Sequence, residues 1–104
     1  MKKHNLFLIY KKYSEEELEG NINLFNEQDW NYISYYQDLS EDFIEKHLDE
    51  VDWDNISFNQ KLSESFIKKH INKINFTLLM RNKKNSLNLK DKIKKEIELL
   101  KEII

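Results

Sequence analysis

The sequence predicts an all-α fold of tandem short helical hairpins, about four 23–26-residue units stacked as a small solenoid-like array with a longer C-terminal helix. Three observations support this. Residues 29–51 recur as residues 52–74, with 12 of the 23 aligned positions identical. The 104-residue chain has one glycine and no proline, so it nearly lacks the turn residues that β-sandwiches and barrels need. Apolar residues within each copy recur at helical spacing.

A serine before the second helix of each unit marks the repeat. Ser40, Ser63 and Ser86 are spaced by 23 residues, and Ser14 lies 26 residues before Ser40. Three extra residues near Asn26–Gln28 account for the longer first spacing. One domain of residues 1–104 therefore divides into units of about 3–28, 29–51, 52–74 and 75–104, the first and last degenerate. Terminal repeats diverge because they cap the stack.

Each unit is expected to hold two short helices. The first begins after Asp29, Asp52 or Asn75, whose side-chain oxygens can accept a free backbone N–H. The second begins after Ser40 or Ser63, and a glutamate in its first turn suits the helix dipole. Helices of two or three turns are unstable alone, so burial against neighbouring units must hold them.

The last helix is expected over about Leu87 to Ile104, long enough to serve as a C-terminal lid. Its apolar residues follow one helical face. They are Leu89, Ile93, Ile97, Leu100 and Ile104.

Two histidines occupy equivalent positions in adjacent units, His47 and His70. Equivalent helices pack roughly 8–10 Å apart, and no third ligand stands at a zinc-site spacing. We therefore interpret both as half-buried residues at unit interfaces, each with one nitrogen satisfied. No cofactor or metal is expected.

Serine and glutamine also recur in register, as Ser34 with Gln37 and Ser57 with Gln60. A serine nucleophile needs an adjacent base held by an orienting group, and nothing here resembles that arrangement. Stacked units can instead hydrogen-bond along such a ladder. The chain also lacks cysteine, so the pattern argues against an enzyme.

Aromatic residues divide into core and surface candidates. Trp30 and Trp53 lie at core positions of the repeat, and Tyr35 is expected to be buried because it aligns with Phe58. Two other tyrosines align with asparagines and are expected to be exposed, where tyrosine often anchors an interface. They are Tyr32 and Tyr36.

Charge is segregated along the chain. Residues 13–60 hold 14 acidic residues and one basic residue, whereas residues 61–104 hold 12 basic and 5 acidic ones. Outer positions of the repeat change sign while buried positions are kept, as in Asp38/Lys61, Glu45/Lys68 and Glu50/Lys73. This pattern predicts a bipolar surface that meets a basic partner at one end.

The shared string W-x-x-I-S-x-x-Q-x-L-S-E-x-F-I-x-x-H, present in both copies, resembles a short helical repeat of phage, giant-virus and low-GC bacterial proteins. The resemblance covers residues 29–74 and extends weakly into the flanks. It implies an α-helical array in a viral or mobile-element setting. It transfers no active-site residue.

These patterns predict a non-catalytic protein-binding module, because stacked repeats offer a surface. The specific hypothesis is a phage- or virus-type inhibitor of a host defence protein, such as a nucleic-acid-binding nuclease, whose ligand phosphates the acidic face imitates. That face is predicted to comprise Tyr32, Tyr36, Asp38, Asp42, Glu45 and Asp49.

Two alternatives stay open. The basic half could bind nucleic acid, with steep salt dependence, through Lys61, Lys68, Lys69, Lys73, Arg81, Lys83 and Lys84. Chains could also self-assemble, end to end or as a homodimer through the C-terminal helix. The apolar run after the first lysines is too short for a signal peptide or membrane span. A cytoplasmic protein without membrane contact, in the host cytoplasm if viral, is therefore expected.

Overall fold

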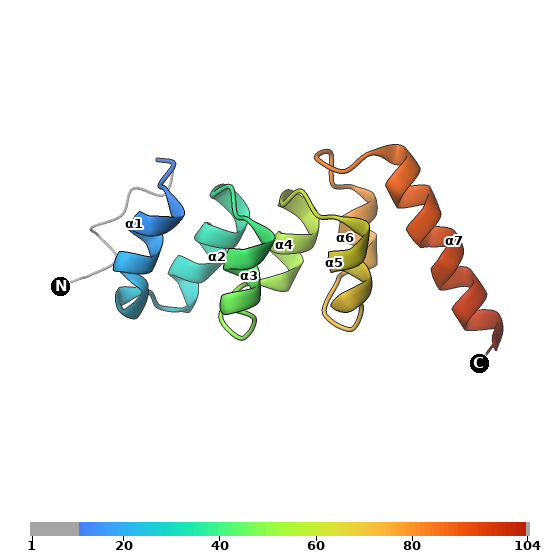
Figure 1. The fold of residues 1–104 in the computed structure, drawn as a ribbon, viewed down its shortest axis with the longest axis horizontal. Helices are drawn as coiled ribbons and strands as arrows, with labels where there is room; N and C mark the ends of the chain where they lie inside the picture. The colour runs from blue at the N-terminus through green and yellow to red at the C-terminus, as the bar shows by residue number, and fades with distance from the viewer. Residues whose placement is uncertain (1–10, 104) are drawn as a thin grey trace.

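The computed structural model describes residues 11–103, and that part of the chain is helical without strands (Figure 1). The molecule is elongated, with principal extents of 52 × 24 × 20 Å. Its elements are α1 (Glu15–Gly20), the 3-10 helix η2 (Ile22–Leu24), α2 (Glu27–Tyr36), α3 (Glu41–Lys46), α4 (Trp53–Asn59), α5 (Glu64–Lys69), α6 (Phe76–Met80) and α7 (Leu87–Ile103). The predicted first helix of unit one falls on residues outside the described range, as does Ile104.

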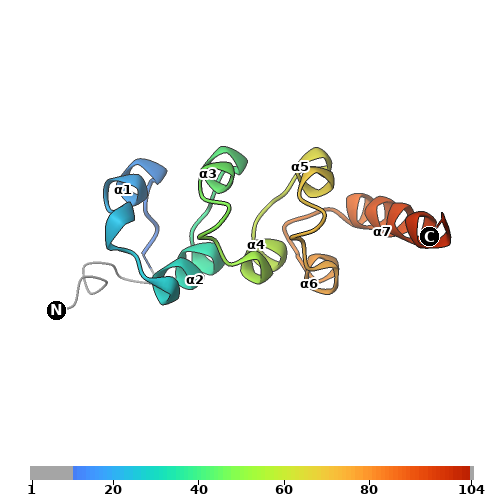
Figure 2. The ribbon, with the colours of Figure 1, turned by 90° about the horizontal axis from the view of Figure 1, so that it is seen from below.

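The helices lie in two rows (Figure 2). One row contains α2, α4 and α6, in which α2 packs on α4 and α4 packs on α6. The other contains α1, α3 and α5, and α7 follows at the C-terminal end. Connections from the first row to the second therefore lie at one end of the helices, and the return connections lie at the opposite end (Figure 1).

Serine caps begin the second-row helices, as the sequence predicts. The hydroxyls of Ser14, Ser40 and Ser63 each accept the backbone N–H three residues later. Ser86 accepts the Leu89 N–H at the start of α7 in the same way. Each cap satisfies one of the free N–H groups of a helix start.

Asp29 is not the N-cap of α2, contrary to the prediction. The cap is Asn26, whose side chain accepts the Asp29 N–H while the Asp29 carboxylate accepts the Asn26 N–H. This reciprocal capping starts the helix one turn earlier, so α2 has 10 residues and α4 has 7. Asp52 does occupy the N-cap position of α4, but its side chain makes no capping hydrogen bond.

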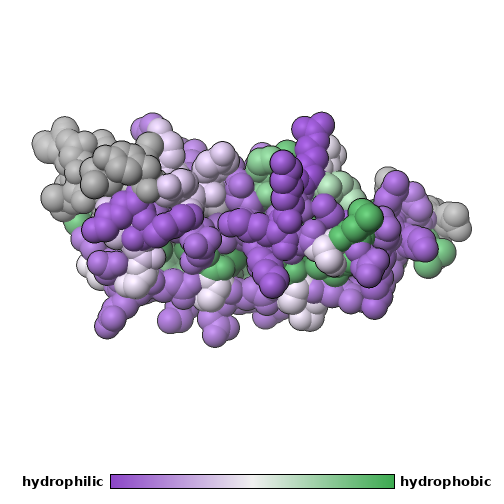
Figure 3. Space-filling model, turned by 90° about the horizontal axis from the view of Figure 1, so that it is seen from above, coloured by the Kyte–Doolittle hydropathy of each residue, from purple (hydrophilic) through white to green (hydrophobic). Residues whose placement is uncertain are grey.

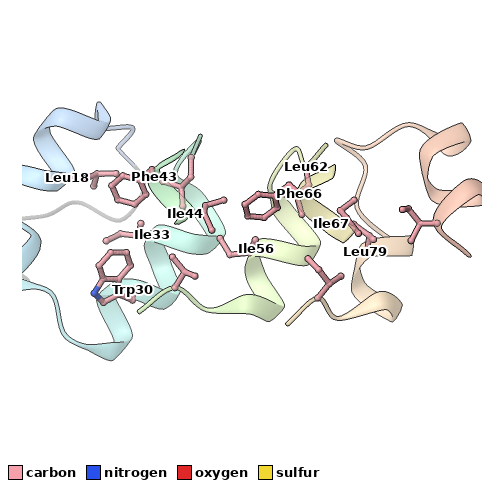
Figure 4. Close-up of a cluster of buried hydrophobic side chains, with 14 residues drawn as sticks. Leu18, Trp30, Ile33, Phe43, Ile44, Ile56, Leu62, Phe66, Ile67 and Leu79 are labelled. Carbon is pink, nitrogen blue, oxygen red and sulfur yellow. The ribbon is translucent and has the colours of Figure 1, made fainter. Parts of the chain in front are cut away.

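Equivalent apolar residues of successive units form one continuous core (Figure 4). Its members include Leu18, Ile33, Phe43, Ile44, Ile56, Leu62, Phe66, Ile67 and Leu79. Full burial of an aliphatic side chain stabilises the fold by about 1.5–3 kcal/mol. This burial holds helices of five to ten residues that would not persist alone.

Two tyrosines depart from the prediction. Tyr35 is 51% exposed rather than buried, because it follows the buried Ser34 directly and so points away from the face that carries Ile33 and Ser34. Tyr36 is half-buried rather than exposed. The Lys12 ammonium lies 4.2 Å from the centre of the Tyr36 ring and donates to the Tyr36 carbonyl.

Candidate functional site

Glutamine side chains join successive units. Gln60 Oε1 accepts the Leu39 N–H at 3.0 Å, and Gln60 Nε2 donates to the carbonyls of Ser34 and Gln37 at 2.9 and 2.7 Å. Gln37 acts in the same way one unit earlier, accepting the Tyr13 N–H at 2.8 Å and donating to the Lys11 carbonyl at 2.7 Å. Both glutamines are buried, so their amides hydrogen-bond between units and are not available to a ligand at the surface.

Two asparagines divide this role in the last unit. Asn85 Oδ1 accepts the Leu62 N–H at 3.0 Å, and Asn82 Nδ2 donates to the carbonyls of Ser57 and Gln60 at 2.8 Å each. The ladder therefore continues without a glutamine at its third step.

Ser34 and Ser57 are fully buried and complete the ladder, as predicted. Ser34 Oγ accepts the Asp52 N–H and Ser57 Oγ accepts the Asn75 N–H, both at 2.9 Å. Ser57 also donates to the Trp53 carbonyl at 2.7 Å. These hydrogen bonds hold the residue that precedes the first helix of the next unit.

Both histidines lie at unit interfaces, as predicted. His47 Nε2 is 2.8 Å from Glu19, and His70 Nε2 is 2.7 Å from Glu45 in the preceding unit. Each imidazole also packs against the tryptophan and phenylalanine of its own unit, with ring centres 4.6–5.5 Å apart. Within the described residues no group of three or more acidic or histidine side chains could hold a metal ion.

The residues of the predicted acidic face do not share one surface. Asp38 lies in the connection from α2 to α3 and pairs with Lys12 and Lys84. Asp49 lies in the connection from α3 to α4, at the opposite end of the helices (Figure 1). The hydrogen bond from His70, together with Lys69, holds the pKa of the Glu45 carboxyl below its ordinary value. Tyr32 and Asp42 are exposed, on α2 and α3 respectively.

The basic residues are also dispersed. Lys68 pairs with Glu64 and Glu96, Lys69 with Glu45, and Lys84 with Asp38. Four others are exposed and make no ion pair within residues 11–100, namely Lys61, Lys73, Arg81 and Lys83. Lys61 and Lys73 lie in connections at opposite ends of the helices (Figure 1). No single basic stripe results.

A groove between the start of α2 and the connection from α3 to α4 gathers acidic residues instead. We call it the acidic groove. Its apolar lining is Phe25, Trp30 and Val51; its amides are Asn26 and Asn31; its carboxylates are Glu27, Asp49, Glu50 and Asp52. No basic residue is among these lining residues.

The extra turn of α2 builds one wall of this groove. Because the helix starts at Glu27, Phe25 and Asn26 stand beside the 49–52 connection. The next repeat lacks the extra turn and carries different side chains at the aligned positions of that connection, Asn72, Lys73 and Asn75. The predicted acidic face includes Asp49 but lacks Glu27, Glu50 and Asp52. The insertion near Asn26–Gln28 was the available signal.

Two of the four carboxylates of the groove have a polar partner. Glu50 lies 3.6 Å from His47 Nδ1, and Asp52 accepts from the Asn55 side chain. Glu27 and Asp49 are exposed and have no ion-pair partner among residues 11–100. Like charges held together repel, so a bound cation would lower the electrostatic free energy of the groove.

Comparison of the chain with protein-family models, curated proteins and solved structures gave no match. The resemblance of residues 29–74 to a phage and viral repeat therefore stays a prediction. In the part of the chain that the structure describes, no helix is long and apolar enough to cross a membrane.

Proposed function

We propose that the chain is a non-catalytic protein-binding module, a solenoid-like stack of four helical hairpins that holds a basic segment of a partner protein in its acidic groove. One observation carries the proposal. The groove combines an apolar lining with four carboxylates and no basic side chain.

Lysine and arginine fit this combination of surfaces. Their methylene stems cover apolar surface while their charged heads remain at its edge. Phe25 and Val51 offer apolar surface for such a stem in the same groove as the carboxylates of Glu27 and Asp49. Arginine can also bind a carboxylate through two parallel hydrogen bonds.

A nucleic-acid-binding enzyme offers such basic segments where it binds phosphates. The proposal therefore includes the role of a phage- or virus-type inhibitor, which occupies the basic cleft of a host defence nuclease in the host cytoplasm. The excess of acidic residues in residues 13–60 supports this role. Direct nucleic-acid binding is less well supported, since Lys68, Lys69 and Lys84 are already ion-paired.

The test uses fluorescently labelled octa-arginine, with a labelled DNA duplex as the second probe, and measures fluorescence anisotropy at low and high salt. The groove variant is D49N/E50K, which copies the residues found at Asn72 and Lys73 in the next repeat. We expect at least about tenfold weaker peptide binding, equivalent to about 1.4 kcal/mol. Added salt should weaken binding of the peptide to the unmodified protein.

The matched control is E16K/D42N, which changes the net charge by the same amount at exposed positions outside the groove. We expect the control to keep at least half of the affinity for the peptide. If both variants lose affinity equally, charge alone drives binding and the groove assignment is wrong. Preference for the DNA duplex over octa-arginine would overturn the proposed function.

A further inference from the structure

The outer side of the row formed by α2, α4 and α6 carries aromatic and apolar side chains that the core does not use. Ile33, Ile56 and Leu79 are buried in the core. At 3.6 residues per turn, the residues one position before and two positions after each of them face away from the core. They are Tyr32, Tyr35, Asn55, Phe58, Leu78 and Arg81. We call these six residues the outer stripe, and its side of the row faces away from α1, α3 and α5 (Figure 2).

The apolar members of the outer stripe are accessible. Tyr35 is 51% exposed and Tyr32 is 37% exposed. Phe58 and Leu78 are half-buried, but neither belongs to the core or to the partly buried side chains packed against it in the described residues. Most of the surface that Figure 3 shows is hydrophilic, with a few hydrophobic patches. Contiguous apolar surface on such a protein marks an interaction site, and tyrosine is a preferred anchor there.

The stripe repeats once per helix along the row. Tyr35, Phe58 and Arg81 are spaced by 23 residues, the period of the repeat. Helix α2 packs on α4 and α4 packs on α6, and Asn55 Nδ2 donates to the Asn31 carbonyl at 3.3 Å, which joins the outer sides of α2 and α4. Packed helices lie about 8–10 Å apart. An extended ligand that follows the row therefore meets one residue of this series at each step of that length.

A segment in the polyproline II conformation matches this spacing. Such a segment has three residues per turn and rises about 3.1 Å per residue, so every third residue points the same way at steps of about 9 Å. A β-strand presents side chains on one face about every 6.6 Å, which does not match the distance between the helices.

An α-helical ligand matches the spacing at every seventh residue but not the chemistry of the stripe. A docked amphipathic helix needs a continuous hydrophobic groove, whereas Asn55 interrupts the apolar residues between Tyr32 and Leu78. The hydroxyls of Tyr32 and Tyr35 are hydrogen-bond donors. The backbone carbonyls of polyproline II have no internal partner and can accept from them, whereas those of a helix are already bonded within the helix.

Charge indicates what lies at one end of the ligand. Arg81 is exposed, makes no ion pair among residues 11–100 and is the only charged residue of the stripe. It stands one helix beyond Phe58, where it can bind a carboxylate. One cation offers few phosphate contacts to a nucleic-acid strand. We infer that the outer stripe binds a proline-rich segment of a partner protein, with prolines three residues apart on Tyr35 and Phe58 and an acidic residue at Arg81.

Fluorescence anisotropy with labelled peptides tests this inference. The probes are nonaproline followed by two glutamates, nonaproline preceded by them, and a Gly-Ser peptide of equal length with the same glutamates. One of the proline peptides should bind at least about fivefold more tightly than the Gly-Ser peptide, because its bound conformation is already formed. The tighter of the two gives the direction of the segment.

Substitutions in the stripe locate the binding site. Tyr35→Ala and Phe58→Ala should each weaken binding of the tighter proline peptide at least about fivefold. The matched control is Leu87→Ala, which removes an apolar side chain that is 70% exposed on α7, outside the stripe. L87A should bind like the unmodified chain. Circular dichroism verifies that each variant keeps its helices, and the exposed Tyr35 keeps the test decisive if F58A unfolds.

A charge swap tests the position of the acidic residue. Arg81→Glu should weaken binding of the glutamate peptide and favour a nonaproline peptide with two lysines at the same end. If R81E discriminates between the two peptides as the unmodified chain does, the acidic residue is wrongly placed.

The stripe is separate from the acidic groove, since none of its six residues lines that groove. D49N/E50K should therefore bind the proline peptide normally, and its loss of that peptide would assign binding to the groove. Any of three further results would overturn the inference. They are a folded Y35A variant that binds as tightly as L87A, no peptide binding at about millimolar protein, and tighter binding of labelled oligothymidylate than of the proline peptides.

Discussion

At the scale of single residues, one amide side chain determines how two units join. The connection between two helices contains backbone groups that become buried in the stack and must find partners. A glutamine amide carries both an acceptor and two donors, so Gln60 alone satisfies the N–H of Leu39 and the carbonyls of Ser34 and Gln37. Asparagine is shorter, and the last unit needs both Asn82 and Asn85 for these contacts.

Replacing Gln60 with alanine should be among the most destabilising changes in the chain. Q60A leaves three buried backbone groups unpaired, so we expect a loss of about 3 kcal/mol. Q37A should cost less, because its partners at Tyr13 and Lys11 are closer to solvent. Urea denaturation followed by circular dichroism measures both. An equal or larger loss in Q37A would contradict this account of the ladder.

The contact between Glu45 and His70 makes the stability of the interface between two units depend on pH. Its pKa lies below the ordinary value because His70 and then Lys69 bind its charged form. A lowered folded-state pKa stabilises the protein above the unfolded-state pKa, about 4.3 for glutamate, and the contribution is lost as pH falls through the folded-state value. As pH falls below about 5, E45Q should therefore lose less stability than the unmodified chain does.

Urea midpoints measured at neutral pH and at about pH 3 test this prediction. The control is E16Q, which removes an exposed glutamate that has no partner in the described residues. E16Q should keep the pH dependence of the unmodified chain. Identical curves for E45Q and E16Q would show that the His70 contact contributes nothing to acid sensitivity.

At the scale of elements, the sequence predicts what local chemistry decides. The second-row helices begin where predicted, because a serine cap acts on a backbone N–H only three residues away. The predicted start of α2 was wrong, because Asn26 and Asp29 are both good capping residues. Their reciprocal hydrogen bonds make Asn26 the N-cap. The sequence pattern alone does not show which of two capping residues, one turn apart, begins the helix.

The candidate site was predictable only in part, for a related reason. The excess of acidic charge in residues 13–60 is visible in the sequence, but its distribution depends on the path of the chain. Successive connections between the two rows of helices lie at opposite ends, which separates Asp38 from Asp49 (Figure 1). Long-range pairs such as Glu45 with His70 then remove individual acids from the free surface.

At the scale of the whole molecule, the contacts run almost entirely between neighbouring units. The hydrogen bonds of the ladder between units join residues 18 to 26 positions apart. If the chain is a repeat stack, as proposed above, it gains stability unit by unit and interface by interface. The polar ladder fixes the register of each interface, while the aliphatic core supplies most of its free energy.

Hydrogen exchange should show this organisation in segments that are not helical. The Leu39 and Leu62 amides lie in connections but donate to the buried side chains of Gln60 and Asn85. Each should exchange at least about 100-fold more slowly than the amide just before it, at Asp38 or Lys61, since exchange then requires opening of the interface between two units. Residue-resolved exchange measured by NMR compares each pair of adjacent amides directly. If Leu39 exchanges as fast as Asp38, the ladder does not hold the units together in solution; if both leucine amides are protected to the same extent, the two interfaces open as one cooperative structure.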